Sequence, residues 1–221
     1  MRYPKFMPSR NTVREYAPGS YYHVYNRGVA KQPIFVDNSD YTVFLSLLKR
    51  HLSNEPQIDR FGRLHPHYKD QVELLAFCLM PNHFHFLIHQ DKDAQALSRF
   101  MKSVCTAYTM YFNRKYQRVG PLFQGRFKAS RVSRDEYLQH ISRYIHLNPK
   151  DYRQYEWSSL PYYLDGRRAE WLSPKRVLDL FEGTDYLKFL EDYKEHKAML
   201  DELQYELADT IFARSDPAKD S

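Results

Sequence analysis

The chain has 221 residues, a formal net charge of +6 at pH 7, 43% hydrophobic residues and 16% aromatic residues. These values fit one large domain, or one domain with an extension, that buries a core and folds by itself. No apolar run approaches the roughly 20 residues that cross a bilayer, and residues 1–5 lead into no apolar signal region. Composition therefore excludes an integral membrane protein, and we expect a soluble cytoplasmic protein with no membrane partner.

Residue periodicity predicts strands and helices in an ordered alternation. Clusters of aromatic and β-branched residues mark the strands, and apolar residues at helical spacing mark the helices. The expected elements, in chain order, are a strand at Ser20–Asn26, a helix at Asp37–His51 capped by Asn38, Ser39 or Asp40, strands Val72–Leu79 and His83–His89 joined as an antiparallel hairpin, a helix at Asp93–Arg114, a strand at Phe127–Val132, and a helix that opens at the capping box Ser133–Glu136 and ends near Leu147.

This order is the ferredoxin-like split βαβ pattern, which predicts an α+β fold. Its antiparallel sheet would carry helices on one face, and the last helix would be an addition beyond the pattern. We expect a main domain over residues 1–165 and a helical C-terminal extension over 166–221, with a frayed tail at Ser215–Ser221.

Two histidines, His83 and His85, stand two residues apart in the second strand of the hairpin. Side chains in a strand alternate between faces, so the two imidazoles project from one face and could hold one metal ion. A pair of hydrogen-bonded core histidines is the alternative. His65 and His67 have the same spacing, but they lie in a polar loop and read as solvated residues.

The segment from Arg99 to Arg134 contains nine Lys and Arg residues and no Asp or Glu between them. Aromatic residues such as Tyr111, Tyr116 and Phe123 are interleaved with these cations. Cations that neutralise phosphates, beside rings that stack on bases, are what a single-stranded nucleic acid site needs. The alternative is an ordinary solvated basic face.

A third pattern lies in the last predicted helix, where Tyr144 and Asn148 are four residues apart and share one face. Ile141 and Ile145 lie near that face, so it should point at the sheet. Tyr144 is then either a core aromatic residue, with Asn148 a residue that ends the helix, or a polar partner of the histidine pair.

Separated sequence blocks over residues 18–165 resemble one known family. The chain is similar to the REP-associated tyrosine transposases, relatives of the single-tyrosine insertion-sequence transposases in the HUH nuclease superfamily. The matching blocks, in the family's order, are Tyr22–Gly28, Met80–His85, Gly120–Phe127, Arg143–Pro149 and Trp157–Ser159.

The resemblance implies a metal-dependent single-strand DNA endonuclease and strand transferase, with residues 1–165 as its HUH catalytic domain. His83, His85 and Asn148 would be the protein ligands of Mg²⁺ or Mn²⁺, which suits nitrogen and oxygen donors. Tyr144 would be the nucleophile and would form a covalent 5′-phosphotyrosine. The DNA would be single-stranded and hairpin-forming, as in repetitive extragenic palindromes. The protein would act in DNA transposition and recombination, in a bacterial cytoplasm, at the nucleoid when bound.

The leading DNA contacts, by analogy with the family, are Arg126, Lys128 and Arg131. Further candidates from the matching blocks and the basic run are Arg27, Arg114, Lys115, Arg118 and Arg143.

Two other classes stay open, namely a catalytically inactive module that binds hairpin DNA and a phosphoesterase that leaves no covalent adduct. The stretch Lys150–Tyr152 and the long loop Ser53–Lys69 depart from the family pattern. The acidic C-terminal extension could pack over the DNA groove as a regulator or serve as a helical support. The DNA sequence, the general base for Tyr144, and the choice between monomer and homodimer are not fixed by the sequence.

Overall fold

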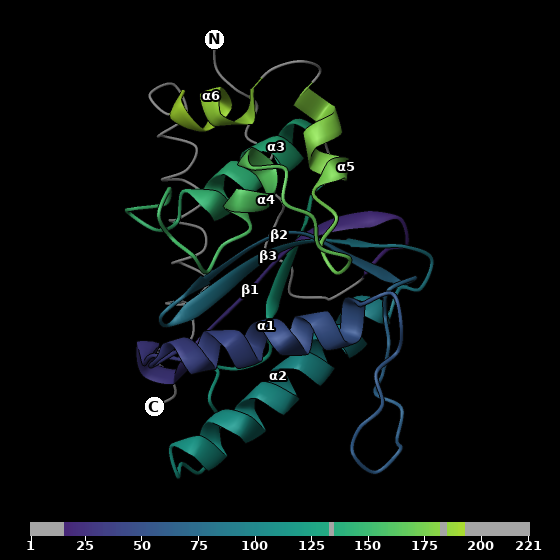
Figure 1. Ribbon diagram of the computed structural model, residues 1–221, viewed down its shortest axis with the longest axis vertical. Helices are drawn as coiled ribbons and strands as arrows, with labels where there is room; N and C mark the ends of the chain where they lie inside the picture. Colours follow the sequence, from purple (N-terminus) through teal and green to yellow (C-terminus); the bar gives the residue numbers. More distant parts are fainter. Residues whose placement is uncertain (1–15, 133–134, 182–184, 193–221) are drawn as a thin grey trace, which may run out of the picture.

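A four-stranded antiparallel sheet lies between two layers of helices (Figure 1). The computed structural model describes residues 16–132, 135–181 and 185–192. The strand order is β2-β3-β1-β4, which is the split βαβ arrangement that the sequence predicts. The strands are β1 (Ser20–Arg27), β2 (Val72–Met80), β3 (His83–Gln90) and β4 (Lys128–Val132).

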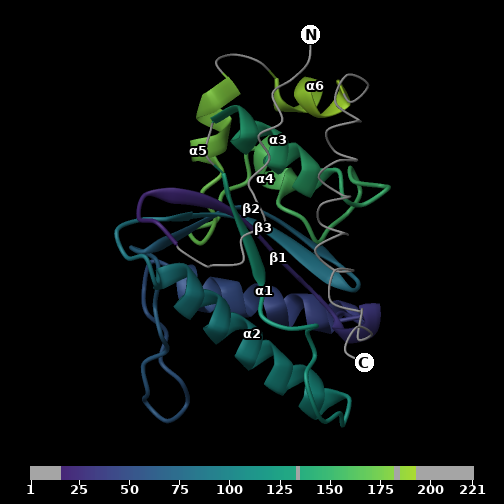
Figure 2. The same ribbon diagram turned by 180° about the vertical axis from the view of Figure 1, so that it is seen from behind.

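Two long helices cover one face of the sheet, and the remaining helices lie over the other face (Figures 1 and 2). The prediction of helices on one face plus an additional helix beyond the pattern is therefore confirmed. The first layer holds α1 (Asn38–Leu52) and α2 (Ala96–Lys115). The second layer holds α3 (Asp135–His146), α4 (Leu160–Leu164), α5 (Lys175–Leu178) and α6 (Tyr186–Glu191). The described residues also form two short 3-10 helices, η1 (Val29–Lys31) and η2 (Asp179–Phe181).

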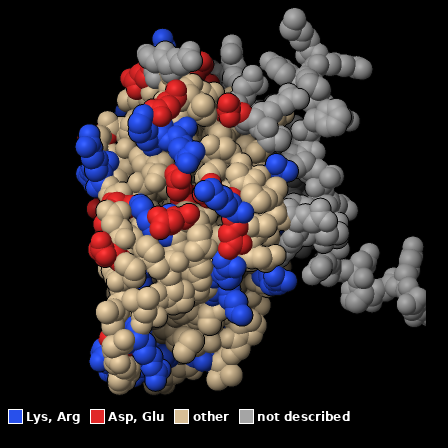
Figure 3. Space-filling model, turned by 90° about the vertical axis from the view of Figure 1, so that its right-hand side faces the viewer, with Lys and Arg blue, Asp and Glu red and all other residues tan. Residues whose placement is uncertain are grey.

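Within the described ranges, no helix is both long enough and apolar enough to cross a membrane. On the face drawn in Figure 3, Lys and Arg side chains are interspersed with Asp and Glu. This face is therefore not uniformly basic.

Helix α1 begins with a reciprocal capping box formed by two aspartates. The side chain of Asp37 accepts hydrogen bonds from the Ser39 and Asp40 amides, and the Asp40 carboxylate accepts one from the Asp37 amide. The predicted caps Asn38, Ser39 and Asp40 are therefore wrong, because the N-cap residue is Asp37. Lys115 at the end of α2 binds both carboxylates and so joins the two helices.

The alternating side chains of the strands divide the molecule into two cores. Phe84 and Phe86 of β3 pack with α1 and α2, whereas Leu87 packs against Ile141 and Ile145 of α3. The second core also takes buried residues from both sides of the predicted boundary at residue 165, and these are Leu160, Tyr163, Val177, Phe181, Tyr186 and Leu190. The boundary stays a prediction, while the extension supplies part of the core that holds α3.

A buried polar network fixes α3 to the sheet and to α6. His146 Nδ1 lies 2.7 Å from the Tyr186 hydroxyl, and His146 Nε2 lies 2.7 Å from Ser159 Oγ. The Ser159 hydroxyl in turn bonds the backbone N–H and C=O of Phe77 on β2. The imidazole of His146 is wholly buried, and these partners replace the hydrogen bonds to water that it loses on burial.

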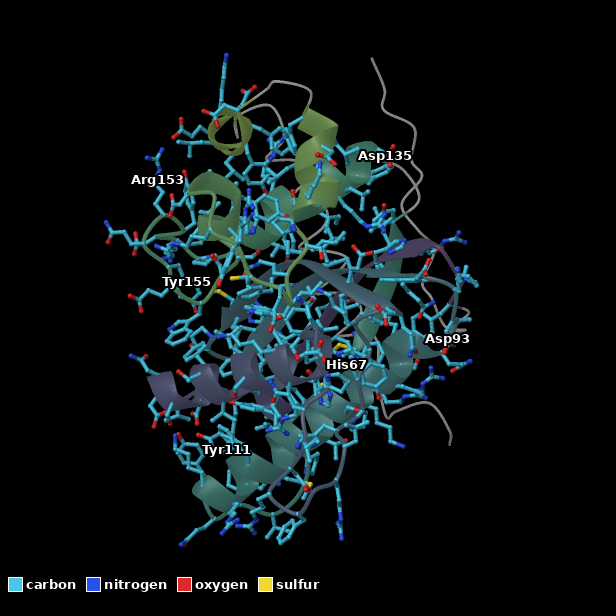
Figure 4. The ribbon with its side chains drawn as sticks, turned by 45° about the vertical axis from the view of Figure 1, so that its right-hand side comes forward. His67, Asp93, Tyr111, Asp135, Arg153 and Tyr155 are labelled. Atoms are coloured by element: carbon cyan, nitrogen blue, oxygen red, sulfur yellow. The ribbon has the colours of Figure 1, made fainter. Side chains whose placement is uncertain are left out.

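The segment from 155 to 159 covers the free edge of β2. The Leu79 amide donates to the Trp157 carbonyl at 2.9 Å, and the Ser159 amide donates to the Phe77 carbonyl at 2.9 Å. The Tyr155 hydroxyl donates to the Leu79 carbonyl at 2.6 Å, and Figure 4 places Tyr155 beside the sheet. An edge strand paired in this way cannot recruit another strand.

The turn between β2 and β3 is held from the other side by the segment that follows β1. The Gly28 amide donates to the Asn82 carbonyl at 2.9 Å, and the Ile34 amide donates to the Pro81 carbonyl at 2.8 Å. A Cβ on Gly28 would overlap the carbonyl oxygen of Gln32 and touch Ile34. Only glycine fits this close approach of two backbones.

Two predictions from the sequence fall outside the described residues. Ser133 and Arg134 of the expected capping box lie there, as does the tail Ser215–Ser221.

We predict that Gly28→Ala lowers the free energy of unfolding by about 1–3 kcal/mol, because the added methyl must push one backbone away from another. Urea unfolding followed by circular dichroism measures the change. Ala30→Gly is the matched control, since Ala30 has a φ of 50°, a value that glycine adopts without strain. Equal stability of the Gly28→Ala variant and the unmodified chain would contradict the close-approach argument.

Candidate active site

The α3-facing side of the sheet carries a cluster of aromatic and imidazole rings. In the ladder of β1 and β3, Tyr25 stands opposite His85 and Arg27 stands opposite His83. Alternation along β1 places His23 on the same face as Tyr25 and Arg27. The central two strands thus present two neighbouring rows of polar side chains to α3.

His83 and His85 lie side by side on this face, as their spacing predicts. Their ring centroids are 5.0 Å apart, and the ring planes are nearly perpendicular at 83°. His65 and His67, the pair with the same spacing, are separated from this site in the loop before β2, where His67 Nε2 lies 2.6 Å from the Ser53 carbonyl.

Tyr144 and Asn148 reach the same place from α3 and the residues just after it. The Tyr144 ring centroid lies 5.2 Å from that of His85 and 5.6 Å from that of His23, in edge-to-face arrangements. Asn148 Oδ1 lies 3.2 Å from His83 Nε2. The four residues that the sequence singles out are therefore brought together in space.

Burial sets the protonation of these groups. Loss of solvent lowers the pKa of His83 to about 4, although Asn148 Oδ1, which can accept a hydrogen bond from the protonated ring, opposes the shift. The pKa of His85 lies well below its ordinary value, chiefly from burial and also from the neighbouring imidazoles. Burial raises the pKa of Tyr144. At neutral pH the imidazoles are uncharged donors of lone pairs, and the phenol keeps its proton.

No three His, Cys, Asp or Glu side chains converge to hold a metal among the residues that the structure describes. The predicted ligand set differs in kind, since it has two histidines and one amide. His83 Nδ1 lies 2.6 Å from Asn82 Oδ1, an acceptor, so the ring proton sits on Nδ1 and the lone pair on Nε2. Nε2 and Asn148 Oδ1 are then two acceptors 3.2 Å apart.

Two acceptors facing each other repel unless a cation or a proton lies between them. Ligand atoms at right angles around an ion with bonds of about 2.1 Å are about 3 Å apart, close to the observed separation. The residues present therefore fit a small divalent cation held by His83 Nε2 and Asn148 Oδ1.

Three members of this cluster were not singled out by the sequence reasoning, namely His23, Tyr25 and Asn82. His23 Nε2 lies 3.0 Å from His85 Nδ1, and the two rings stack at 5.1 Å. The signal available in the sequence was the alternation of Tyr21, His23 and Tyr25 in the first strand, which marks one polar aromatic face.

The proposed DNA contacts divide into groups by position. Arg27 lies on the α3-facing side of the sheet, opposite His83 in the ladder of β1 and β3, and Lys128 stands opposite Tyr25 in the ladder of β1 and β4. Arg126 is exposed in the loop that Gly125 ties to the end of β1, through a 3.1 Å hydrogen bond from Asn26 Nδ2. Arg27 and Lys128 therefore share the face that carries the cluster, and Arg126 lies in the loop that is bonded to the end of β1.

Four other candidates lie away from that face. Arg131 stands opposite Tyr22, whose side chain belongs to the α1–α2 core, so Arg131 points to the opposite side of the sheet from Lys128. The remaining three are at or just after the C-terminal end of α2, and they are Arg114, Lys115 and Arg118. The charge of Lys115 is already balanced by Asp37 and Asp40.

Arg143 is a correction to the predicted DNA contacts, because only 2% of this residue is exposed. Its guanidinium stacks on the Phe189 ring at 3.6 Å and donates to the Asp192 carbonyl. A side chain enclosed by α3 and α6 cannot reach a strand of DNA on the surface.

Comparison with known proteins adds a family to this geometry. Residues 63–148 match the family model described as "Transposase IS200 like". The matched segment contains His83, His85, Tyr144 and Asn148. The chain is therefore similar to this family over that segment, and the match supports a transposase-like role in DNA processing. The predicted resemblance to the insertion-sequence transposases is confirmed over this segment. No curated protein matches the chain.

Two solved structures are similar to this one. A structure titled as a REP-associated tyrosine transposase bound to a REP hairpin has a TM-score of 0.52 at 14% identity, over 72% of this chain and 87% of that one. A candidate transposase from Deinococcus radiodurans R1 has a TM-score of 0.37 at 16% identity, over 61% of this chain and 92% of that one. At this identity the first likeness establishes the α+β fold alone.

We predict that acid destabilises the protein between about pH 6.5 and pH 3. Burial lowers the pKa of His146 and of His23 to about 3, so the unfolded chain binds more protons in this range. Stability is then fully present above the unfolded pKa and is lost as the pH falls toward the folded one. Each such histidine contributes a slope of up to about 1.4 kcal/mol per pH unit.

Urea unfolding at a series of pH values measures this slope. His146→Gln should reduce the slope of the free energy of unfolding against pH by about the contribution of one bound proton. This reduction is expected whatever the effect of the substitution on stability at pH 7. A free energy of unfolding that does not change from pH 7 to pH 4.5 would contradict the assignment of neutral buried imidazoles.

Proposed function

We propose that the chain is a metal-dependent single-strand DNA endonuclease and strand transferase that works through a covalent 5′-phosphotyrosine on Tyr144. The observation that carries the proposal is the meeting of the Tyr144 ring with His85, and of Asn148 Oδ1 with His83 Nε2. Two elements far apart in the sequence converge on one point, with a nucleophile from one and metal-binding imidazoles from the other.

The cleavage step exchanges one ester bond to phosphorus for another, and the proton that leaves the phenol balances the proton that the departing oxygen takes up. Tyr144 Oη attacks the scissile phosphorus, and the bond from phosphorus to the 3′ oxygen breaks. The tyrosine then carries the 5′ phosphate, and the departing 3′ oxygen takes up a proton to become a hydroxyl. A Mg²⁺ or Mn²⁺ ion bound by His83, His85 and Asn148 would polarise the phosphate and offset its developing charge.

Burial defines the difficulty of this step. The raised pKa of Tyr144 keeps the phenol protonated at neutral pH, so the proton must leave Oη as the new bond forms. Asn148 acts in the opposite direction, since its hydrogen bond lowers the pKa of the same phenol. Asn148 thus holds the nucleophile and faces His83 at once. The phosphotyrosine keeps the phosphodiester energy, so a 3′ hydroxyl can reverse the step and join strands.

The substrate that we propose is a DNA hairpin with a single-stranded flank. Arg27 and Lys128 lie on the same face as the cluster and could pair with phosphates that flank the scissile position, and the similar solved structure is titled as bound to a REP hairpin. A repetitive palindrome in bacterial DNA is therefore the proposed target, and the protein would be found at the nucleoid when bound.

We predict that Tyr144→Phe abolishes cleavage of a hairpin oligonucleotide with a single-stranded flank, by at least roughly 10³-fold, because the nucleophilic oxygen is lost. A denaturing gel with 5′- and 3′-labelled DNA measures both cutting and the protein-linked band. Tyr137→Phe, two turns earlier on the same helix, is the matched control and should cut normally. Chelation of divalent ions should also stop cutting.

Three outcomes separate the alternatives. Unchanged cutting by Tyr144→Phe would remove the proposed nucleophile. Cutting without any protein-linked band would indicate a phosphoesterase instead. Hairpin binding without cutting, with Mg²⁺ or Mn²⁺ present, would indicate an inactive DNA-binding module.

We predict that Arg27→Ala and Arg126→Ala each weaken hairpin binding and reduce the slope of log affinity against log salt by about 0.7–0.9. Fluorescence anisotropy at several salt concentrations measures both quantities. Arg168→Ala is the control, because Arg168 is exposed on the connection after α4. Slopes that stay equal to that of the unmodified chain would remove both arginines from the DNA path.

A further inference from the structure

We propose that His23 is a positioning residue that fixes the tautomer of His85, by accepting the Nδ1 proton of His85 on its own Nε2. His85 Nε2 is then left as the lone-pair atom that faces the site. The role toward a metal rests on the proposed function, whereas the tautomer itself does not.

The contact between the two imidazoles is short and enclosed. His23 Nε2 and His85 Nδ1 are 3.0 Å apart, and the residues are 2% and 4% exposed. Their rings are 19° from parallel, with centroids 5.1 Å apart. Water does not compete for either atom at this burial, so one ring must carry the shared proton.

Two ring nitrogens 3.0 Å apart share one proton, so two arrangements are open for the pair. The shared proton lies either on His85 Nδ1 or on His23 Nε2. In the second arrangement, His85 would carry its own proton on Nε2 and could not bind a cation through that atom.

The partners of His83, the neighbouring ligand, support the arrangement with the proton on His85 Nδ1. His83 has its Nδ1 2.6 Å from Asn82 Oδ1, an oxygen that can only accept, and it has its Nε2 3.2 Å from Asn148. His83 therefore donates through Nδ1 and presents Nε2. With His23 as the acceptor, His85 follows the same pattern, and both ligands are oriented by a partner on their outer nitrogen.

In this arrangement Asn82 and His23 have the same role, because each accepts the Nδ1 proton of one of the two histidines His83 and His85. Asn82 lies in the β2–β3 turn and its backbone is held by Gly28, whereas His23 lies in the middle of β1 between β3 and β4. Each comes from a rigid part of the fold, so neither imidazole has to be ordered when an ion arrives.

The test uses the full chain, free of metal and labelled with ¹⁵N in its histidine rings. Long-range ¹H–¹⁵N correlation spectra report which nitrogen of each imidazole carries the proton. We expect His85 to be protonated on Nδ1 in the unmodified chain. In His23→Phe, which removes the acceptor but keeps a ring, we expect the Nε2-protonated form of His85 to dominate.

Titration with Mn²⁺, followed by the loss of the free-ion electron paramagnetic resonance signal, gives a second readout without DNA. His23→Phe should weaken Mn²⁺ binding by roughly 10- to 100-fold. His23→Gln keeps a carbonyl acceptor and should restore both the Nδ1 tautomer and most of the affinity. The control is His89→Gln, because His89 lies on β3 on the same face as His85 but outside the cluster. This substitution should change neither the tautomer of His85 nor the Mn²⁺ affinity.

An Nε2-protonated His85 in the unmodified chain would overturn the proposal, and so would unaltered Mn²⁺ affinity in a folded His23→Phe variant. If His23→Phe does not fold, the spectrum of the unmodified chain decides alone. If His85 is protonated on Nδ1 and no covalent adduct forms with DNA, the proposed nuclease activity is contradicted but the role of His23 is not. A covalent adduct together with an Nε2-protonated His85 would support the nuclease and contradict the role of His23.

Discussion

The pairing register of β1 with β3 is the constraint on which the rest of the site depends. It places Tyr25 opposite His85 and Arg27 opposite His83, and alternation then brings His23 within hydrogen-bonding distance of His85. A slip of one residue would turn every β1 side chain to the other face. The apolar residues on the opposite face, packed against α1 and α2, oppose such a slip, so the core specifies the site.

Helix α3 is the second half of the arrangement, and its position does not come from the sheet alone. His146 bridges Tyr186 of α6 and Ser159, and Ser159 bonds β2. Tyr144 lies two residues before His146 on the same helix, so the C-terminal extension helps to set where the phenol lies. Of the two roles left open for the extension, helical support agrees with these contacts within the described residues.

Local patterns were enough to predict the elements, the split βαβ order, the shared face of His83 and His85, and the helical spacing of Tyr144 and Asn148. The elements and these spacings depend on neighbours within a few residues, and the split βαβ order follows from the succession of the elements along the chain. His23 needed the register between strands some sixty residues apart, which no local pattern fixes. Arg143 was misplaced because its position in a matching block suggested a DNA contact, whereas Phe189 and α6 enclose it. Asp37 was missed as the cap because four adjacent polar residues can all serve.

Mass spectrometry of the DNA-linked protein tests the central claim most directly. After reaction with a hairpin oligonucleotide, nuclease treatment and tryptic digestion, cleavage after Arg143 and Lys150 isolates a peptide with Tyr144 as its sole tyrosine. Convergence of α3 with the histidine pair predicts that this peptide carries the residual nucleotide through a phosphodiester to tyrosine. A nucleotide found on any other peptide would contradict the account.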